Sequence, residues 1–428
     1  MSRTKISLES HSGAEVELQK QQLSHDGGRV LGNVALIAGT TVGAGILALP
    51  AVTLPSGVVP STFLLIAVWL YTVISALLLA EVCVNAMGRE GGLSVGLLKM
   101  VEGTLGYMGA RIAGAAYLFL HYALLVAYVT EGGNILVSGM SQLWGGENIF
   151  PGWVGTMIFT CLFGGMMYLG REKFIEKLNS AFVGIVIISF LGLLWLGSGQ
   201  VTSVQLLTHN WTSLSSAVSV MLVALFFHNV VPVVVTRLEG NIPKIRQSII
   251  IGSLIPLMMF LLWNAVILGS VSADMLSTGD FDPLQILRSG GAGEWLGILL
   301  SIFSEFAIAT SFIGFVYGLR DFFKDIFPLT QQPASSRLPL YSLILLPPMS
   351  LGAINPKIFI TALDFAGTFS ISVLGGIIPA LMSWKQRQEP HLNMHQSLVP
   401  GGKLTLISMM GIASVLIMKQ ILVMSGYL

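Results

Sequence analysis

Long apolar runs separated by short polar stretches make up almost the whole chain after residue 29. Each run is about 20 residues or longer, the length that a helix needs to cross the hydrocarbon core of a bilayer. None shows the alternation of apolar and polar residues that a membrane β-barrel strand requires. The pattern therefore predicts an all-α polytopic membrane protein with eleven spans, near residues 30–54, 60–86, 110–138, 151–170, 176–197, 214–235, 247–270, 294–319, 338–355, 358–384 and 404–427.

Composition supports this class. Of 428 residues, 54% are hydrophobic and only 10% are charged, with a mean hydropathy of +0.79, whereas soluble domains carry about 25% charged residues. The net charge of +1 and the lack of a basic patch argue against a nucleic-acid partner. No metal-spaced cysteine pair, zinc-protease motif or phosphate-binding glycine loop is present, so we expect no cofactor and no enzyme. Cys83 and Cys161 both lie in apolar runs and are expected to be buried, unbridged thiols.

The loop charges predict the orientation. Nineteen of the 22 lysines and arginines fall in the amino-terminal tail and in alternate loops, and such a bias marks the cytoplasmic side. We therefore place the amino terminus in the cytoplasm and the carboxyl terminus outside. Residues 1–29 are expected to be a disordered cytoplasmic tail, too rich in acids for a transit peptide. In the long loop 88–109, the stretch GLLKMVEGTLGYM is expected to form a short helix on the cytoplasmic face.

The first span contains GTTVGAGILALP, from Gly39 to Pro50. Glycine costs a helix interior about 1 kcal/mol relative to alanine, and a break in lipid is tolerated only where protein or a cavity covers it. One interpretation is that Gly39, Gly43 and Gly45 let another helix approach closely. The other is that the helix is interrupted here.

The sixth span favours the interruption. It reads SVMLVALFFHNVVPVVV, with His228 and Asn229 at its middle and Pro232 close behind. Two interrupted spans at matching places in two halves indicate a transporter built from inverted repeats. Within a transmembrane domain of residues 30–428, we expect repeat one at about 30–197, repeat two at about 214–384 and one extra helix at about 404–427.

Two broken helices offer a binding site for a zwitterion. Unwinding near Gly43–Ala44–Gly45 frees backbone N–H groups, which together with the helix dipole can hold a carboxylate. Carbonyl groups freed in Gly39–Thr41 and Phe227–Asn229 can accept from an ammonium group. Phe226 and Phe227 either line a side-chain pocket or serve in packing. The predicted ligand is an amino acid.

These residues carry a family resemblance. GNVALIAGTTVGAGILALP resembles the first span of bacterial hydroxy/aromatic amino acid permeases, in particular the tyrosine-specific transport protein group. FFHNVVP with the following EGNIPKIRQSIIIGSLIPLMMFLLWNAVILGS is similar to the sixth and seventh spans, and EFAIATSFIGFVYGLRDFFKD to the eighth. The similarity runs from about Leu31 to Leu428.

The resemblance implies the LeuT-type fold of the amino acid/polyamine/organocation superfamily, in which broken spans one and six hold the substrate. It also implies uptake driven by an ion gradient, usually of protons. Tyrosine is the expected substrate and tryptophan the next, while related branches handle serine or threonine. A bacterial inner (plasma) membrane is the expected location, with a plastid membrane as the alternative. A sensor that binds without transport, a channel and a membrane enzyme are less favoured functions.

In that fold span three lines the cavity, so Tyr122 or Tyr128 could cover the substrate. The expected partners of the protein are an amino acid, a co-transported proton or sodium ion, and membrane lipid. The expected substrate-binding residues are Gly39, Thr40, Thr41, Gly43, Ala44, Gly45, Tyr122, Phe226, Phe227, His228 and Asn229.

Ion coupling is expected from Glu81, His228 and a group in span eight. His228 qualifies because imidazole titrates near physiological pH, and Glu81 is either a structural hydrogen-bonding residue or a proton-coupling one. In span eight, Ala307, Thr310 and Ser311 match the sodium-site spacing of the LeuT-type fold, although such hydroxyls often bond back to the preceding turn. Further intramembrane candidates are His121, Glu131, Glu305, Asp364 and Lys419.

Overall fold

The computed structural model is helical, with no strand among the residues it describes. Ten helices in the described part are long and apolar enough to cross a membrane, or eleven when one bent pair counts as a single span. The predicted all-α, eleven-span plan is therefore confirmed, whereas the tail 1–29 lies outside the described residues. The structure describes residues 30–43, 45–89, 96–143, 150–199, 201–207, 209–270, 293–326, 337–388 and 397–427.

Most spans start or end a few residues away from the predicted limits, because several helices run on into polar or charged residues. The short α8 (Ser203–Leu207) and η2 (Trp211–Ser216) stand between the fifth and sixth spans. The spans are, in order, Val30–Thr41 with α2 (Gly45–Thr53); α3 (Val58–Arg89); α4 (Leu97–Leu143); α5 (Gly152–Phe159) with η1 (Thr160–Gly164) and α6 (Gly165–Leu169); α7 (Glu172–Ser198); α9 (Val218–Ala224) with η3 (His228–Val230) and α10 (Val231–Arg237); α11 (Ile242–Ser270); α13 (Gly293–Ile326); α14 (Arg337–Ile354); α15 (Phe359–Phe365) with η6 (Ala366–Ile377) and α16 (Ile378–Gln386); and α17 (Gly402–Met424).

The short helix expected in the loop 88–109 is present as the first part of α4. Gly106 separates it from the membrane span with a φ of 79°, a conformation that glycine adopts without steric cost. A side chain at this position would be strained, so the glycine sets the kink between the two parts of α4.

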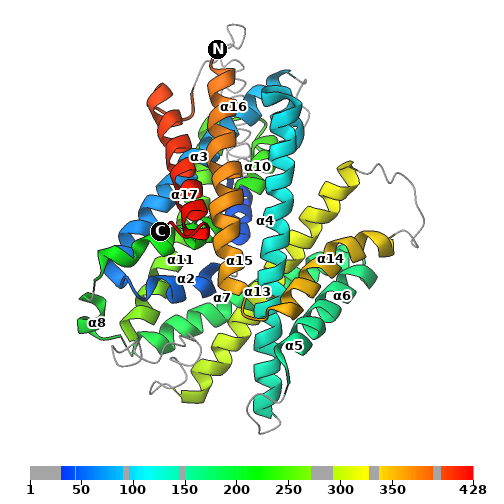
Figure 1. The fold of residues 1–428 in the computed structure, drawn as a ribbon, viewed down its shortest axis with the longest axis vertical. Coiled ribbons are helices and arrows are strands. Elements are labelled where there is room, and N and C mark those ends of the chain that lie inside the picture. The colour runs from blue at the N-terminus through cyan, green and yellow to red at the C-terminus, as the bar shows by residue number, and fades with distance from the viewer. Residues whose placement is uncertain are drawn as a thin grey trace, which may run out of the picture.

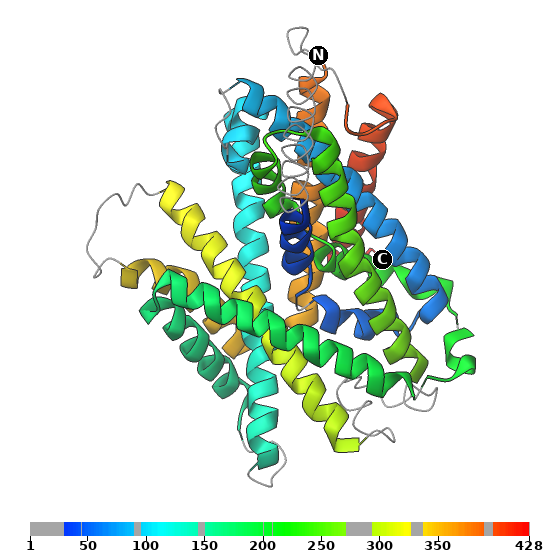
Figure 2. The ribbon, with the colours of Figure 1, turned by 180° about the vertical axis from the view of Figure 1, so that it is seen from behind.

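α4 and the span α15–α16 stand side by side through the middle of the molecule (Figures 1 and 2). α5, α6 and α14 lie on one side of this pair, and α3, α11 and α17 lie on the other (Figure 1). α7 and α13 cross the pair, as Figure 2 shows from behind. α2 packs on α9 and α11. The two interrupted spans are therefore enclosed by continuous ones.

α17 lies at the edge, against η6 and α16, and keeps most of its apolar surface exposed, as a membrane helix facing lipid would. Both cysteines are unpaired, as predicted. Cys83 is buried, but Cys161 is exposed, so the expectation that both are buried was wrong. Cys161 lies in the π-helical turn η1, which presents it on the outer surface. The inverted repeat stays a prediction.

Glu81 is held by four hydrogen bonds. Arg387 donates from Nε to Oε1 at 2.8 Å and from Nη2 to Oε2 at 2.9 Å, and the Ser383 hydroxyl and the Leu398 amide each donate at 3.0 Å. The carboxylate is 3% exposed. It ties α3 to the end of α16 and to the segment before α17. Of its two expected roles, the structural one fits, and Glu81 takes no part in the cavity described below.

We predict that Arg387→Ala destabilises the protein by about 3 kcal/mol, because it strands the Glu81 carboxylate in a buried position. Thermal unfolding of the detergent-purified protein measures the loss. Lys385→Ala, an exposed position on the same helix, is the matched control and should leave the melting temperature unchanged. Equal melting temperatures for the two variants would contradict the structural role of the pair.

Candidate functional site

The first span is broken as predicted. Its first helix ends at Thr41 and α2 starts at Gly45, with a bend of 54° between the two. Val42 still donates to the Ala38 carbonyl, and the Ile46 amide donates to Gly43 at 3.1 Å. Because Gly45 opens a new helix, its N–H has no acceptor within that helix. Ala44, named as a binding residue, lies outside the described residues.

Glycines at this break allow contacts that a side chain would prevent. A Cβ on Gly45 would lie 2.7 Å from the Ala224 Cα in span six, and one on Gly43 would collide with the Ser311 hydroxyl of α13. Gly39 has open space around it. Gly43 and Gly45 therefore let neighbouring helices approach the first span closely, whereas Gly39 does not. The two interpretations of the glycines are compatible, because the helix is also broken at this place.

The sixth span is also broken. α9 ends at Ala224, Phe227 has a non-helical φ of −140° and ψ of 16°, and a single 3₁₀ turn leads into α10. Pro232 lies in the first turn of α10, where a missing N–H costs no hydrogen bond. The interruption therefore precedes the His–Asn pair, and the proline begins the second half-helix.

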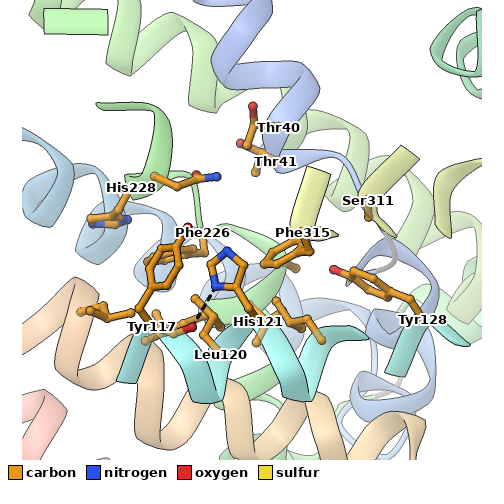
Figure 3. Close-up of a pocket in the computed structure, with 18 of the residues that line it drawn as sticks. Thr40, Thr41, Tyr117, Leu120, His121, Tyr128, Phe226, His228, Ser311 and Phe315 are labelled. Atoms are coloured by element: carbon orange, nitrogen blue, oxygen red, sulfur yellow. Dashed lines mark hydrogen bonds between the residues drawn. The ribbon is translucent and has the colours of Figure 1, made fainter. Parts of the chain in front are cut away.

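The two breaks face one cavity, which α4, α13 and η6 complete (Figure 3). Its lining is mostly apolar and aromatic, with backbone and a few polar side chains between. From the two broken spans come Thr40, Thr41, Gly43, Gly45, Val223, Ala224, Phe226, His228 and Asn229; from the other elements come Leu97, Tyr117, Leu120, His121, Leu124, Tyr128, Ser311, Phe315, Ile371 and Leu374.

His228 is 2% exposed and hydrogen-bonded on one side only. Its Nε2 lies 2.8 Å from the Ser75 hydroxyl, and Ser75 donates its single hydrogen to the Gly375 carbonyl. Ser75 must therefore accept from His228, which places a hydrogen on Nε2 and leaves Nδ1 as an acceptor. Nδ1 is buried and without a partner in the described structure. The imidazole is thus neutral, stacked on Phe226 at 4.8 Å.

One face of α4 forms the cavity wall opposite the first span. It carries Tyr128 and His121, which the sequence analysis named, and Tyr117, Leu120 and Leu124, which it missed. Tyr117, Leu120, Leu124 and Tyr128 recur at helical spacing around His121. His121 donates from Nδ1 to the Tyr117 carbonyl at 2.8 Å and touches the Phe315 ring (Figure 3). Tyr128 reaches towards Ser311 with its hydroxyl. Given one cavity residue on this helix, the spacing of three or four residues along the sequence would have predicted the others.

Four residues that the sequence predicted for the site do not line the cavity: Tyr122, Phe227, Ala307 and Thr310. Tyr122, one step of about 100° from His121 around the helix, donates its hydroxyl to Leu343 of α14 at 2.8 Å. Phe227 is 1% exposed and belongs to the apolar core. Of the span-eight set only Ser311 reaches the cavity, because the Thr310 hydroxyl donates to the Ala307 carbonyl at 3.0 Å. The sequence left two roles open for the Thr310 hydroxyl, a sodium ligand or a hydrogen bond to the preceding turn. The structure has the hydrogen bond.

The tenth span departs from α-helical geometry where it meets the cavity. η6 is a π-helix of 12 residues that includes Ile371 and Leu374. Ser219 of α9 and Thr368 share a hydrogen bond of 2.6 Å, and Gly367 allows η6 to touch the Ser219 backbone. π-helical segments are rare and frequently occur at functional sites, and this one contacts the start of span six.

Comparison with known proteins gives the family. The family model of the tryptophan/tyrosine permeases matches residues 27–420. The chain belongs to the tryptophan/tyrosine permease family. Membership confirms the resemblance seen in the first, sixth and eighth spans, and it makes the protein a transporter-family member rather than an enzyme.

Relatives within this permease family carry different substrate names. Tyrosine-specific transport system 2 of Haemophilus influenzae is 29% identical over 94% of this chain and 98% of its own length. The tryptophan-specific transport protein of the same organism is 28% identical over 84% of this chain and 88% of its own. Glutamine transporter 2 of Aliivibrio fischeri is 25% identical over 88% and 95%.

We predict that Gly45→Ala destabilises the permease by about 1 to 3 kcal/mol, the range for inserting a methyl into a packed site, because Ala224 meets it with backbone. Gly39→Ala is the matched control and should be neutral or slightly stabilising, since alanine favours the helix there. Thermal unfolding of both variants measures the difference. A Gly45→Ala protein as stable as the Gly39→Ala protein would show that spans one and six are not in contact here.

Proposed function

We propose that the protein is a secondary active transporter that imports an aromatic amino acid, with tyrosine the first choice and tryptophan the next, across a bacterial inner membrane. The observation that carries the proposal is the meeting of two broken spans at one aromatic-lined cavity, in a chain of the tryptophan/tyrosine permease family. The amino terminus is assigned to the cytoplasm on the loop charges.

The backbone ends at the cavity suit a zwitterion. α2 begins at Gly45, so the positive end of its dipole and its free N–H point to a carboxylate. α9 ends at Ala224, so its last carbonyl groups present partial negative charge to an ammonium group. Both ends line the cavity. No charged side chain is needed for either contact.

The remaining lining suits an aromatic side chain with a hydrogen-bond donor. Phe226, Phe315 and the aliphatic residues of α4 and η6 supply apolar surface. The unpartnered Nδ1 of His228 accepts from a phenol hydroxyl or an indole N–H, the donors of tyrosine and tryptophan. This pairing supports both over serine or threonine, which stay the alternative substrates. The glutamine-transporting relative supports keeping a non-aromatic substrate in the test.

Proton symport is the proposed coupling. A sodium ion would need the Ala307 carbonyl and the Thr310 and Ser311 hydroxyls as ligands, and the first two are bonded to each other. This geometry favours the proton over a sodium-coupled carrier. Transport then proceeds by rocking of spans one, two, six and seven against three, four, eight and nine, with the inverted repeat of the LeuT-type fold as the basis.

Uptake into proteoliposomes tests the proposal. Radiolabelled tyrosine, tryptophan, serine and glutamine are offered under separately imposed proton and sodium gradients. We expect tyrosine to accumulate under an inward proton gradient, with tryptophan competing. Accumulation of serine or glutamine alone would overturn the substrate assignment, and accumulation under sodium alone would overturn the coupling.

We predict that Tyr128→Phe raises the KM for tyrosine about five-fold, the effect of losing one hydrogen bond of about 1 kcal/mol at the cavity. Tyr122→Phe removes the same atom from the neighbouring face of α4, outside the cavity, and should leave KM unchanged. Initial uptake rates over a range of tyrosine concentrations give both values. The reverse order of effects would place the substrate on the other face of α4.

A further inference from the structure

Glu305 lies near the middle of α13, less than two turns before the cavity residue Ser311. Both of its carboxyl oxygens are buried, and neither has a hydrogen-bond partner in the described structure. The neighbouring Ser304 hydroxyl is also buried without a partner. Glu305 therefore differs from Glu81, whose carboxylate receives four donors.

Within the described ranges, the helices packed against α13 bring no cation to this carboxyl group. α7 meets this part of α13 with aromatic rings, Phe182 against Phe306 at 4.9 Å and Phe190 against Phe303 at 5.7 Å. The charged residues of α7 and α14 lie in their opening turns, and those of the last turns of α13 lie well beyond Ser311. These distant groups are Glu172, Lys173, Glu176, Lys177, Arg337, Arg320, Asp321 and Lys324.

On α4 the charged neighbour is another acid. Glu131 is close enough for its charge to interact with Glu305, and it repels a negative charge there. The other titratable groups on this part of α4 are Tyr117, His121, Tyr122 and Tyr128, of which the tyrosines and the buried His121 are neutral hydrogen-bonding groups at the cavity or beside α14.

A carboxylate without donors or a cation is strongly disfavoured in a buried site, and the membrane interior removes the water that would otherwise solvate it. In the conformation seen here Glu305 is therefore the neutral acid. It holds a proton near the middle of α13, the helix that also touches the broken first span through Ser311 and Gly43.

We propose that Glu305 carries the proton that is co-transported with the amino acid. When the site is open to the outside, water delivers a proton to the carboxylate and an O–H bond forms. The neutral side chain then lets α13 close without water against α4 and the first span. When the site opens to the cytoplasm, water enters, the O–H bond breaks and the proton leaves as hydronium. The proposal rests on the proposed transport function and names the residue of its coupling.

Glu305→Gln tests this, because glutamine is a fixed neutral mimic of the protonated acid. In proteoliposomes without a gradient, the variant should exchange external radiolabelled tyrosine for internal tyrosine at a rate within about threefold of the wild type. Under an inward proton gradient it should fail to accumulate tyrosine above the external concentration. The tyrosine-induced proton influx, read with an entrapped pH dye, should be lost. Ser304→Ala is the matched control and should accumulate tyrosine and admit protons like the wild type.

Accumulation and proton influx at wild-type levels in Glu305→Gln would overturn the proposal. A wild-type protein that does not exchange tyrosine, tryptophan, serine or glutamine would overturn the proposed function instead, so the two failures are distinguishable. If Glu305→Gln does not fold, Glu305→Asp decides. It should still couple uptake to protons, with the pH dependence of uptake displaced from that of the wild type, and an unchanged pH profile would count against Glu305.

Discussion

A polypeptide that leaves the helix inside a membrane must be covered by protein, because lipid offers its peptide groups no hydrogen bonds. This constraint accounts for the centre of the structure. Spans one and six both unwind, and continuous helices surround them (Figures 1 and 2). Gly45 against Ala224 and Gly367 against Ser219 allow backbone to meet backbone at these places. The cavity forms where the surrounding helices cover both breaks at one place.

The same enclosure leaves few polar atoms without partners at the cavity, and those few define what it can bind. The hydroxyls of Thr40 and Thr41 donate back to their own helix at 2.7 Å. His228 donates a hydrogen bond from Nε2 to the Ser75 hydroxyl. Polar groups that face a ligand are the backbone at the two helix ends, the Nδ1 of His228, the Tyr128 hydroxyl and Asn229, and the rest of the wall is apolar and aromatic. That set matches a zwitterion with an aromatic side chain better than a charged substrate.

The sequence could predict the number of spans and the two breaks, because glycine and a polar pair stand out inside apolar runs. It could not predict which way each side chain points. His121 and Tyr122 differ by one step around α4, yet only His121 reaches the cavity, and Phe226 and Phe227 divide in the same way. The π-helix η6 was missed because a change from α- to π-geometry leaves no mark in composition. Rotation about a helix axis depends on packing partners, and those come from the fold.

Hydrogen bonding distinguishes a structural carboxyl group in a membrane span, Glu81, from one that we propose to carry a proton, Glu305. Glu81 and Glu305 both looked like coupling candidates, since each is an acid in an apolar span. Glu81 meets an arginine, a hydroxyl and an amide, so its carboxylate joins α3 to α16. Glu305 meets none of these in the described structure, so its charge state follows the water that reaches it. A group that is to gain and lose a proton as helices move must be one that the resting structure leaves unbonded.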